Sequence, residues 1–219
     1  MKTTAIIVAA GSGTRLNSDK PKQFLEIHGK TVIVHTLERF QAAPSIDAII
    51  LVLAEDQIVD FEAAHITKLI KIVSGGSTRA ESVWNGLRSV DTEIVAVHDG
   101  ARPLVSVDEI ERTIEKAKQT GAACLVAVVT DTIKTVRGDE IAATLDRDKL
   151  RRALTPQVFK TEVLRKAFES GDLSSAVTDE CYLVEKLGHP IAFVEGSSRN
   201  IKITHPEDLI LAEAFLKNI

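Results

Sequence analysis

Residues 3–15 read TTAIIVAAGSGTR, a continuous apolar run that leads into a glycine-rich turn, and this junction decides the fold. The run at 4–9 lacks the polar alternation of a strand exposed on one face. It therefore predicts a strand covered on both faces, as in a parallel sheet. Gly11 and Gly13 have no Cβ and can aim successive backbone N–H groups at an anion. A purely structural strand-to-helix turn uses the same residues, so this stretch alone is consistent with both kinds of turn.

Further apolar runs alternate with segments of helical spacing along the rest of the chain. The predicted strands are residues 4–9, 48–53, 69–73, 94–97, 124–129 and 191–194, and the predicted helices are 32–41, 79–90, 107–119, 161–169 and 206–216. This order predicts an α/β three-layer sandwich with a mostly parallel sheet and right-handed crossovers. No repeat or linker suggests a second domain, so residues 1–219 are expected to form a single one.

One stretch interrupts the alternation. Residues 132–136 and 141–145 are rich in β-forming side chains and flank the turn sequence RGDE at 137–140, which is a hairpin signal. No helical segment covers it, so an arm spanning 131–153 is expected to project from the sheet. Because an isolated hairpin is marginally stable, it needs something to pack on. A second subunit is the expected partner, and a hairpin folded back on its own domain is the alternative.

Composition excludes several classes of function. The 27 Lys and Arg residues against 31 Asp and Glu give a net charge of -4, which argues against nucleic acid or an anionic membrane surface as a partner. The apolar runs are far shorter than the roughly 20 residues of a membrane-spanning helix. The N-terminus leads straight into the glycine turn and is interpreted as a strand, not a signal peptide. Cys124 and Cys181 form neither a disulfide framework nor a metal motif, which favours the reducing cytoplasm.

Spacing excludes two known phosphate-binding patterns at the glycine turn. Leu16 occupies the third glycine position of the Rossmann pattern, and no Gly-Lys-[Ser/Thr] follows as in a P-loop. What remains is Gly-x-Gly-x-Arg followed by Pro-Lys. Arg15 and Lys22 add a guanidinium fork and a compact ammonium to the backbone donors, which suits a polyphosphate whose charge grows during a reaction.

Two later segments add candidate binding groups. The loop SGGSTR at 74–79 places two glycines and hydroxyls before a predicted helix, which favours either a nucleotide's polar groups or an ordinary helix cap. Asp99 follows the predicted strand 94–97, at the sheet edge where ligands collect, and could hold Mg²⁺ or be a plain turn residue. Its neighbour His98 is predicted to be structural. Lys202 lies between apolar residues, so its ammonium must reach solvent or an anion.

With these segments assembled, the chain resembles the 2-C-methyl-D-erythritol 4-phosphate cytidylyltransferase family over essentially its whole length. The matching segments follow the family's order and are residues 9–15, 21–23, 75–82, 86–87, 98–99, 131–134, 146–147, 155–157, 178–180, 195–202 and 206–208. Two positions depart from the family's usual pattern, because Gly100 stands where Ala is usual and Ser77 where an acidic residue is common.

The resemblance implies a Rossmann-like nucleotidyltransferase sandwich that joins CTP to 2-C-methyl-D-erythritol 4-phosphate with Mg²⁺. Arg15 and Lys22 match the family's transition-state stabilisers, and Asp99 matches a metal-associated aspartate. The residues that match the sugar-phosphate site are Arg147 and Lys202, with Thr132 and Thr178 nearby. The nucleotide contacts are implied at Ala9, Ala10, Gly11, Gly13, Gly75, Gly76 and Ser82.

The resemblance also implies a homodimer with exchanged arms, in which Thr132 and Arg147 complete the partner's site. Two rival functions remain open at this point. A ribitol 5-phosphate cytidylyltransferase shares the glycine loop and the sheet, but the segments 75–83 and 131–134 are closer to the methylerythritol enzyme. A catalytically silent nucleotide-binding regulator is expected to lose Arg15, Lys22 or Lys202, and all three are present.

Overall fold

The computed structural model describes residues 1–11, 21–171 and 177–217. Its centre is a seven-stranded sheet in the order β11-β7-β10-β6-β1-β4-β5. The strands are β1 (Thr3–Val8), β4 (Ala48–Leu53), β5 (Leu69–Ser74), β6 (Ile94–Asp99), β7 (Ala122–Val128), β10 (Arg151–Lys160) and β11 (Ala192–Glu195). All neighbours are parallel except β10, which runs antiparallel to both β6 and β7. The predicted α/β fold with a mostly parallel sheet is confirmed.

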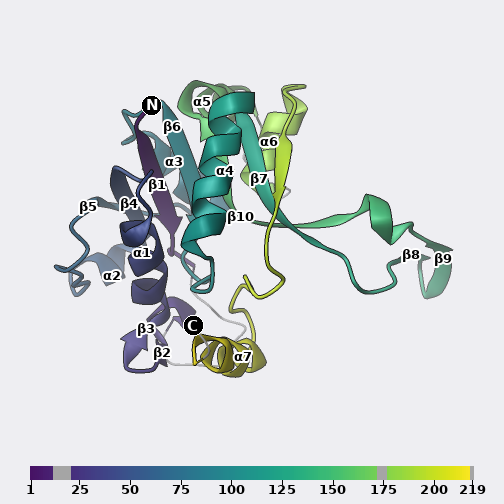
Figure 1. Ribbon diagram of the computed structural model, residues 1–219, viewed down its shortest axis with the longest axis horizontal. Helices are drawn as coiled ribbons and strands as arrows, with labels where there is room; N and C mark the ends of the chain where they lie inside the picture. Colours follow the sequence, from purple (N-terminus) through teal and green to yellow (C-terminus); the bar gives the residue numbers. More distant parts are fainter. Residues whose placement is uncertain (12–20, 172–176, 218–219) are drawn as a thin grey trace.

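Helices cover both faces of the sheet (Figure 1). One face carries α1 (Val32–Ala42) and α4 (Val107–Thr120), and the other carries α3 (Arg79–Leu87), α5 (Thr161–Ser170) and α6 (Glu180–Lys186). Ala5 and Ile7 pack on the first side and Ile6 on the second, and all three are fully buried. This two-sided burial is why the first strand is apolar at consecutive positions.

Strand β10 was not predicted because its sequence, RRALTPQVFK, contains two arginines and a proline. Pro156 follows a cis peptide bond, and the pairing of β10 with β7 shifts register between Ala153 and Gln157. A bulge of this kind accommodates a proline inside a sheet, where it cannot donate to the ladder.

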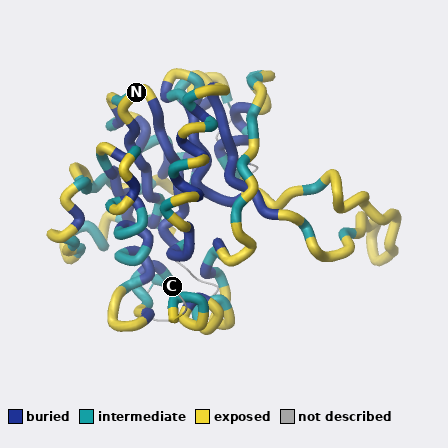
Figure 2. The backbone as a smooth tube through the Cα atoms, viewed as in Figure 1, coloured by how far each residue is buried: buried dark blue, intermediate teal, exposed yellow. Residues whose placement is uncertain are grey.

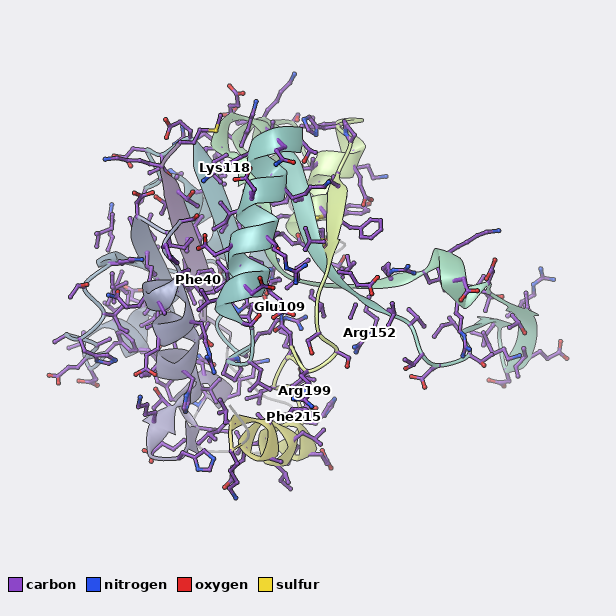
Figure 3. The ribbon with its side chains drawn as sticks, viewed as in Figure 1. Phe40, Glu109, Lys118, Arg152, Arg199 and Phe215 are labelled. Carbon is purple, nitrogen blue, oxygen red and sulfur yellow. The ribbon has the colours of Figure 1, made fainter. Side chains whose placement is uncertain are left out.

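Smaller elements close the carboxyl end of the sheet. They are η2 (Lys22–Phe24), the hairpin β2 (Glu26–Ile27) and β3 (Lys30–Thr31), α2 (Glu55–Ile58) and α7 (Pro206–Leu216). A separate apolar cluster joins Ile27, Ile203 and Ala212 there. Arg199 lies 5.3 Å from the ring centroid of Phe215 on α7, which ties the preceding loop to this helix (Figure 3). Within the described residues, no helix has the length and apolar character to cross a membrane.

The predicted hairpin projects away from the sheet (Figure 1). It consists of β8 (Lys134–Arg137) and β9 (Glu140–Thr144), followed by η3 (Arg147–Lys149). Figure 2 shows the projection exposed along most of its length, and Val136 and Ile141 are 69% and 68% exposed. The predicted arm extends too far, because residues 151–153 already belong to β10 and pair with β7. We use "the arm" below for residues 131–150.

Candidate functional site

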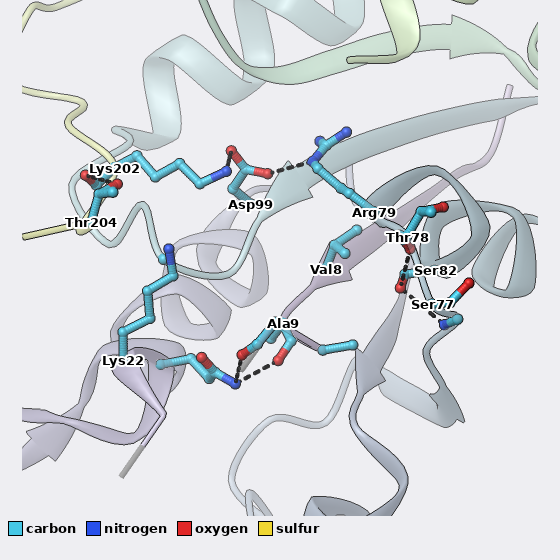
Figure 4. Close-up of a pocket in the computed structure, with 15 residues that line it drawn as sticks. Val8, Ala9, Lys22, Ser77, Thr78, Arg79, Ser82, Asp99, Lys202 and Thr204 are labelled. Carbon is cyan, nitrogen blue, oxygen red and sulfur yellow. Dashed lines mark hydrogen bonds and ion pairs between the residues drawn. The ribbon is translucent and has the colours of Figure 1, made fainter. Parts of the chain in front are cut away.

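A cavity of 460 Å³ opens at the carboxyl ends of β1 and β6, where an open parallel sheet binds its ligands. Its described walls come from the end of β1 with the first glycine turn, η2, the loop before α3, the end of β6 and the segment before α7 (Figure 4). Segments separated by almost 200 positions in sequence therefore share one pocket.

Gln23 holds the first glycine turn against η2. Its side-chain amide is buried and donates to the carbonyl oxygens of Ala9 at 2.7 Å and Gly11 at 3.2 Å. Because Lys22 precedes Gln23, this clamp places the Lys22 side chain in the pocket beside the turn (Figure 4). Lys22 is thereby adjacent to the backbone that was predicted to cradle a phosphate.

The second glycine loop folds onto the start of α3. The N–H of Gly76 donates to Ser82 Oγ at 3.0 Å, and Ser82 Oγ donates to the Thr78 carbonyl at 2.9 Å. Thr78 forms a capping box with Glu81, which stabilises the first turn of α3. A Cβ at position 75 would collide with the Cβ of Ala10, so Gly75 allows the two loops to approach closely.

Asp99 is the single acidic side chain among the described residues that line the pocket. Its Oδ1 accepts from Arg79 Nε at 3.0 Å, and its Oδ2 lies 3.2 Å from Arg102 Nε and 3.0 Å from Lys202 Nζ. Burial alone would raise the pKa of Asp99, but these three cations hold it well below its usual range. Asp99 is therefore an ionised carboxylate that gathers positive charge at one wall of the pocket.

A buried hydrogen-bond network supports Asp99 from behind. Thr155 Oγ1 accepts from the Asp99 N–H at 3.2 Å and lies 2.9 Å from His98 Nδ1. The other ring nitrogen lies 3.1 Å from the Arg102 carbonyl, so it carries the proton and donates. Burial lowers the pKa of His98 to about 3, which keeps the ring neutral. The predicted structural role of His98 is consistent with these contacts.

Lys202 is positioned by its neighbours in the segment before α7. Asn200 is fully buried, and its side-chain amide donates to the Thr155 carbonyl at 2.9 Å. Arg102 Nη1 donates to the Asn200 carbonyl at 2.8 Å, and the Ile203 N–H donates to the Ala101 carbonyl at 2.9 Å. With both flanks fixed, the Lys202 side chain points along the pocket wall to Asp99 (Figure 4).

The structure brings together most of the predicted site residues that it describes. The residues lining the pocket are Ala9, Ala10, Gly11, Lys22, Gly76, Ser82, Asp99 and Lys202. Arg15 and Gly13 lie outside the described residues. Thr132 and Arg147 are on the arm, where Arg147 Nη1 donates to the Thr130 carbonyl at 2.7 Å, and neither lines the pocket of its own chain. Thr178 is exposed just before α6 and does not line the pocket.

Sequence reasoning gave no role to Arg79, Arg102, Gln23 or Glu180. Each lies inside or beside a matching motif, but at least one of the contacts that define the roles of Arg79, Arg102 and Glu180 is distant in sequence: Arg79 pairs with Glu180 across 101 positions, and Arg102 donates to Asn200 across 98. The only available signal for Arg79 was its place at a helix start beside a glycine loop, which does not identify its acidic partner.

One carboxylate is a small donor set for a metal ion. Within the described residues, no group of three or more acidic, histidine or cysteine side chains could hold a metal by itself. Mg²⁺ commonly takes one or two carboxylates and completes its ligands with substrate phosphates and water. Asp99 is the one carboxylate of the described lining that an ion arriving with a polyphosphate could use, and both of its oxygens already face cationic side chains.

Comparisons with known proteins agree with the resemblance seen in the sequence. The family model for 2-C-methyl-D-erythritol 4-phosphate cytidylyltransferase matches residues 3–218. A protein of that name from Syntrophus aciditrophicus is 44% identical over 225 residues, covering 99% of this chain and 96% of the relative. The crystal structure of the Francisella tularensis 2-C-methyl-D-erythritol 4-phosphate cytidylyltransferase has a TM-score of 0.82 at 35% identity, covering 98% of this chain and 99% of that one.

A longer relative shares the same region. The bifunctional enzyme IspD/IspF of Desulfotalea psychrophila is 45% identical over 223 residues, and these cover 99% of this chain but 58% of that protein. The similarity therefore spans somewhat more than half of the bifunctional relative and nearly all of the monofunctional ones.

Proposed function

This chain belongs to the 2-C-methyl-D-erythritol 4-phosphate cytidylyltransferase family, and from this premise we propose how its pocket performs the family's reaction. The protein is a nucleotidyltransferase that transfers CMP from CTP to 2-C-methyl-D-erythritol 4-phosphate. The products are 4-diphosphocytidyl-2-C-methyl-D-erythritol and pyrophosphate, in non-mevalonate isoprenoid biosynthesis.

The chemical problem is repulsion between two anions. A phosphate oxygen of the sugar phosphate attacks the α-phosphorus of CTP in line, and the bond from that phosphorus to pyrophosphate breaks. The nucleophile is already anionic, so no general base is required. Two unit charges 4 Å apart repel by about 4 kcal/mol at an effective dielectric of about 20. Neutralising this repulsion lowers the barrier as well as the binding cost.

The observation that carries the proposal is the convergence of Lys22, Lys202 and the first glycine turn on one cavity. Lys22, together with Arg15, neutralises the triphosphate and the charge that develops on pyrophosphate. Lys202 holds the incoming phosphate on the opposite wall. The nucleoside is held by the two glycine loops, with Gly75, Gly76 and Ser82 near the cytidine and the backbone of residues 9–13 near the phosphates.

Mg²⁺ is proposed as the cofactor because a triphosphate brings more negative charge than Lys22 and Arg15 can balance. Asp99, beside Lys202, is the single acidic side chain among the described residues of the lining and would hold the ion from that wall. When bound, the ion supplies Lewis-acid polarisation of the phosphate oxygens. The protein's own cations then orient the two phosphates for in-line attack.

A homodimer with exchanged arms is proposed from the exposure of the hairpin. The arm leaves Val136 and Ile141 in solvent, and its Arg147 and Thr132 do not line the pocket of their own chain. A partner's pocket would cover the hairpin and gain Arg147 for the sugar phosphate, with Thr132 beside it. Thr178, which the resemblance also implies, lies exposed before α6 and outside the described lining. The two buried cysteines, which form no disulfide, and the phosphorylated substrates support a cytoplasmic location.

The test measures pyrophosphate release with CTP, Mg²⁺ and either 2-C-methyl-D-erythritol 4-phosphate or ribitol 5-phosphate. The wild-type protein should use the first sugar phosphate and discriminate strongly against the second. Lys22→Ala and Arg15→Ala should each lower turnover by roughly 100-fold, as when a transition-state donor is removed. Single-turnover rates like those of the wild type in either variant would refute the proposed roles of these two cations.

A further inference from the structure

Arg79 uses all three of its guanidinium nitrogens on carboxylates. Nη1 and Nη2 donate to Glu180 Oε1 at 2.6 Å and Oε2 at 3.1 Å, and Nε donates to Asp99 Oδ1 at 3.0 Å. A bidentate pair of this kind fixes direction as well as charge, because the planar fork matches the carboxylate. Arg79 lines the pocket, whereas Glu180 does not. The paired Glu180 carboxylate therefore fixes the orientation of the Arg79 Nε–H that bonds Asp99.

Glu180 is anchored outside the pocket. Its side chain is fully buried, and both of its oxygens accept from Arg79. Gln157 of β10 accepts from the N–H groups of Glu180 and Cys181 at 3.1 and 3.0 Å and donates to Asp179 at 2.8 Å. These bonds tie Glu180, the first residue of α6, to the sheet and hold it in a fixed position.

The chain of contacts ends at Lys202. Arg79 occupies Asp99 Oδ1, which leaves Oδ2 to Arg102 and Lys202. Arg102 is held in turn by the Asn200 carbonyl. Figure 4 shows Arg79, Asp99 and Lys202 in a row along one wall, with the Lys22 side chain on the other side of the pocket. Asp99 therefore places the Lys202 ammonium, and Arg79 places the Asp99 carboxylate.

We propose that Glu180 and Arg79 are positioning residues that fix the Lys202 ammonium through Asp99. This inference deepens the proposed function, since it rests on Lys202 as the group that holds the sugar phosphate. The buried Glu180 carboxylate fixes the orientation of the Arg79 guanidinium, which in turn fixes Oδ1 of Asp99. Oδ2 of Asp99 then fixes the position of the Lys202 ammonium. Helix α6 does not line the pocket, yet through these contacts it affects the binding of the sugar phosphate and not of CTP.

Loss of the Glu180 charge should redirect Arg79 toward Asp99. In Glu180→Gln the side chain keeps its size, but its amide nitrogen cannot accept a hydrogen bond. One nitrogen of Arg79 then loses its partner and competes for Asp99, which loosens the contact between Asp99 and Lys202. The relay is the series of contacts from Glu180 through Arg79 and Asp99 to Lys202. The first glycine turn is held by Gln23, and the second glycine loop by the bonds from Gly76 to Ser82 and from Ser82 to Thr78, so neither depends on the relay.

The experiment measures kcat and the KM for each of the two substrates. The proteins compared are the wild type, Glu180→Gln, Arg79→Lys, the double variant that combines these two substitutions, and Lys202→Ala. Glu185→Gln is the matched control, because Glu185 is an exposed carboxylate on the same helix. Glu180→Gln and Arg79→Lys should each raise KM for 2-C-methyl-D-erythritol 4-phosphate roughly tenfold, as for a lost bond to a charged group. KM for CTP should change less than about twofold, and the double variant should match Arg79→Lys alone.

The outcomes separate the relay from a purely structural role. An unchanged sugar-phosphate KM in both single variants, an equal rise in both KM values, or fully additive effects would overturn the relay. If Glu180→Gln does not fold, the KM split in Arg79→Lys decides alone. If Lys202→Ala leaves the sugar-phosphate KM unchanged, the proposed role of Lys202 fails, whereas a rise in Lys202→Ala alone overturns only the relay.

Discussion

His98 lies directly behind the pocket carboxylate and is fully buried against Phe40, with ring centroids 4.8 Å apart. Burial lowers its pKa from 6.5 to about 3. The unfolded chain therefore binds one more proton than the folded chain between these pH values. The contribution of His98 to stability is complete above about pH 6.5 and is lost as the pH falls, by at most about 1.4 kcal/mol per pH unit.

We expect the contribution of His98 to the pH dependence of stability to be absent from His98→Gln. The free energy of unfolding of the wild type, measured in urea, should fall more steeply between about pH 6.5 and about pH 4 than that of His98→Gln. Asp99, Arg102 and Lys202 face the same region in both proteins, so the difference in slope isolates the imidazole. Parallel pH profiles would mean that His98 is not kept neutral by the fold.

At this scale, the sequence identified the residues whose chemistry is visible in a short motif. Lys22 stands near a glycine turn, Asp99 follows a strand, and Lys202 interrupts an apolar segment, so each had a local signal. Arg79 and Glu180 carry no comparable signal, since their roles arise from a pair formed across 101 positions. Local spacing cannot identify such a partner before the topology is known.

Helix α3 packs closely on β1 and β4, and Gly86 is the residue that permits this. A Cβ at position 86 would lie 2.7 Å from Ile6 Cγ2 and 3.1 Å from Val52 Cγ2, which are buried branched side chains in the sheet. Alanine would favour the helix by about 1 kcal/mol at an unconstrained position. In this helix the collision opposes that gain, because the core is already filled.

We therefore expect Gly86→Ala to lower the free energy of unfolding, with an overpacking cost of about 1–3 kcal/mol that exceeds the gain in helix propensity. Chemical denaturation of both proteins measures the difference. Arg88→Ala is the control, because Arg88 is exposed just after the same helix and should change stability by no more than about 0.5 kcal/mol. A Gly86→Ala protein more stable than the wild type would show that α3 can move away from the sheet at little cost.

Elements were predicted where periodicity and burial agree. The helix Pro206–Leu216 and the strand Ala48–Leu53 were predicted with their observed bounds, because proline marks the start of the helix and two-sided burial makes the strand uniformly apolar. Besides several elements of two to four residues, one longer strand and one helix were missed. Strand β10 breaks the apolar pattern with a bulge and a proline, and α6 is a seven-residue helix whose Asp179 cap depends on the sheet through Gln157.

At the scale of the whole molecule, the arm stands out because it leaves apolar side chains in solvent. Its strands β8 and β9 pair only with each other among the described strands, and their apolar side chains are exposed. The sequence indicated the hairpin by its turn and its lack of a covering helix, but not the surface that receives it. In the proposed dimer with exchanged arms, each subunit would both donate an arm and receive one.

Mixing two inactive variants tests whether the arm acts on the partner's pocket. Lys22→Ala damages the pocket, and Arg147→Ala damages the arm. In a dimer with exchanged arms, one site of the heterodimer combines the Lys22→Ala pocket with the Arg147→Ala arm. The other site combines an unsubstituted pocket with an unsubstituted arm. Random assembly makes half of the dimers heterodimers, so activity should recover to about a quarter of the wild-type value.

The matched control mixes Lys22→Ala with Lys202→Ala. Both side chains line the same cavity of one chain, so neither site of that heterodimer is intact and activity should stay low. Co-expression with two affinity tags verifies that heterodimers form in each mixture. If the tagged heterodimer of Lys22→Ala and Arg147→Ala is as inactive as the control, each arm serves its own chain or none. Recovery confined to the first mixture is expected only if the two phosphates meet between cations from different subunits.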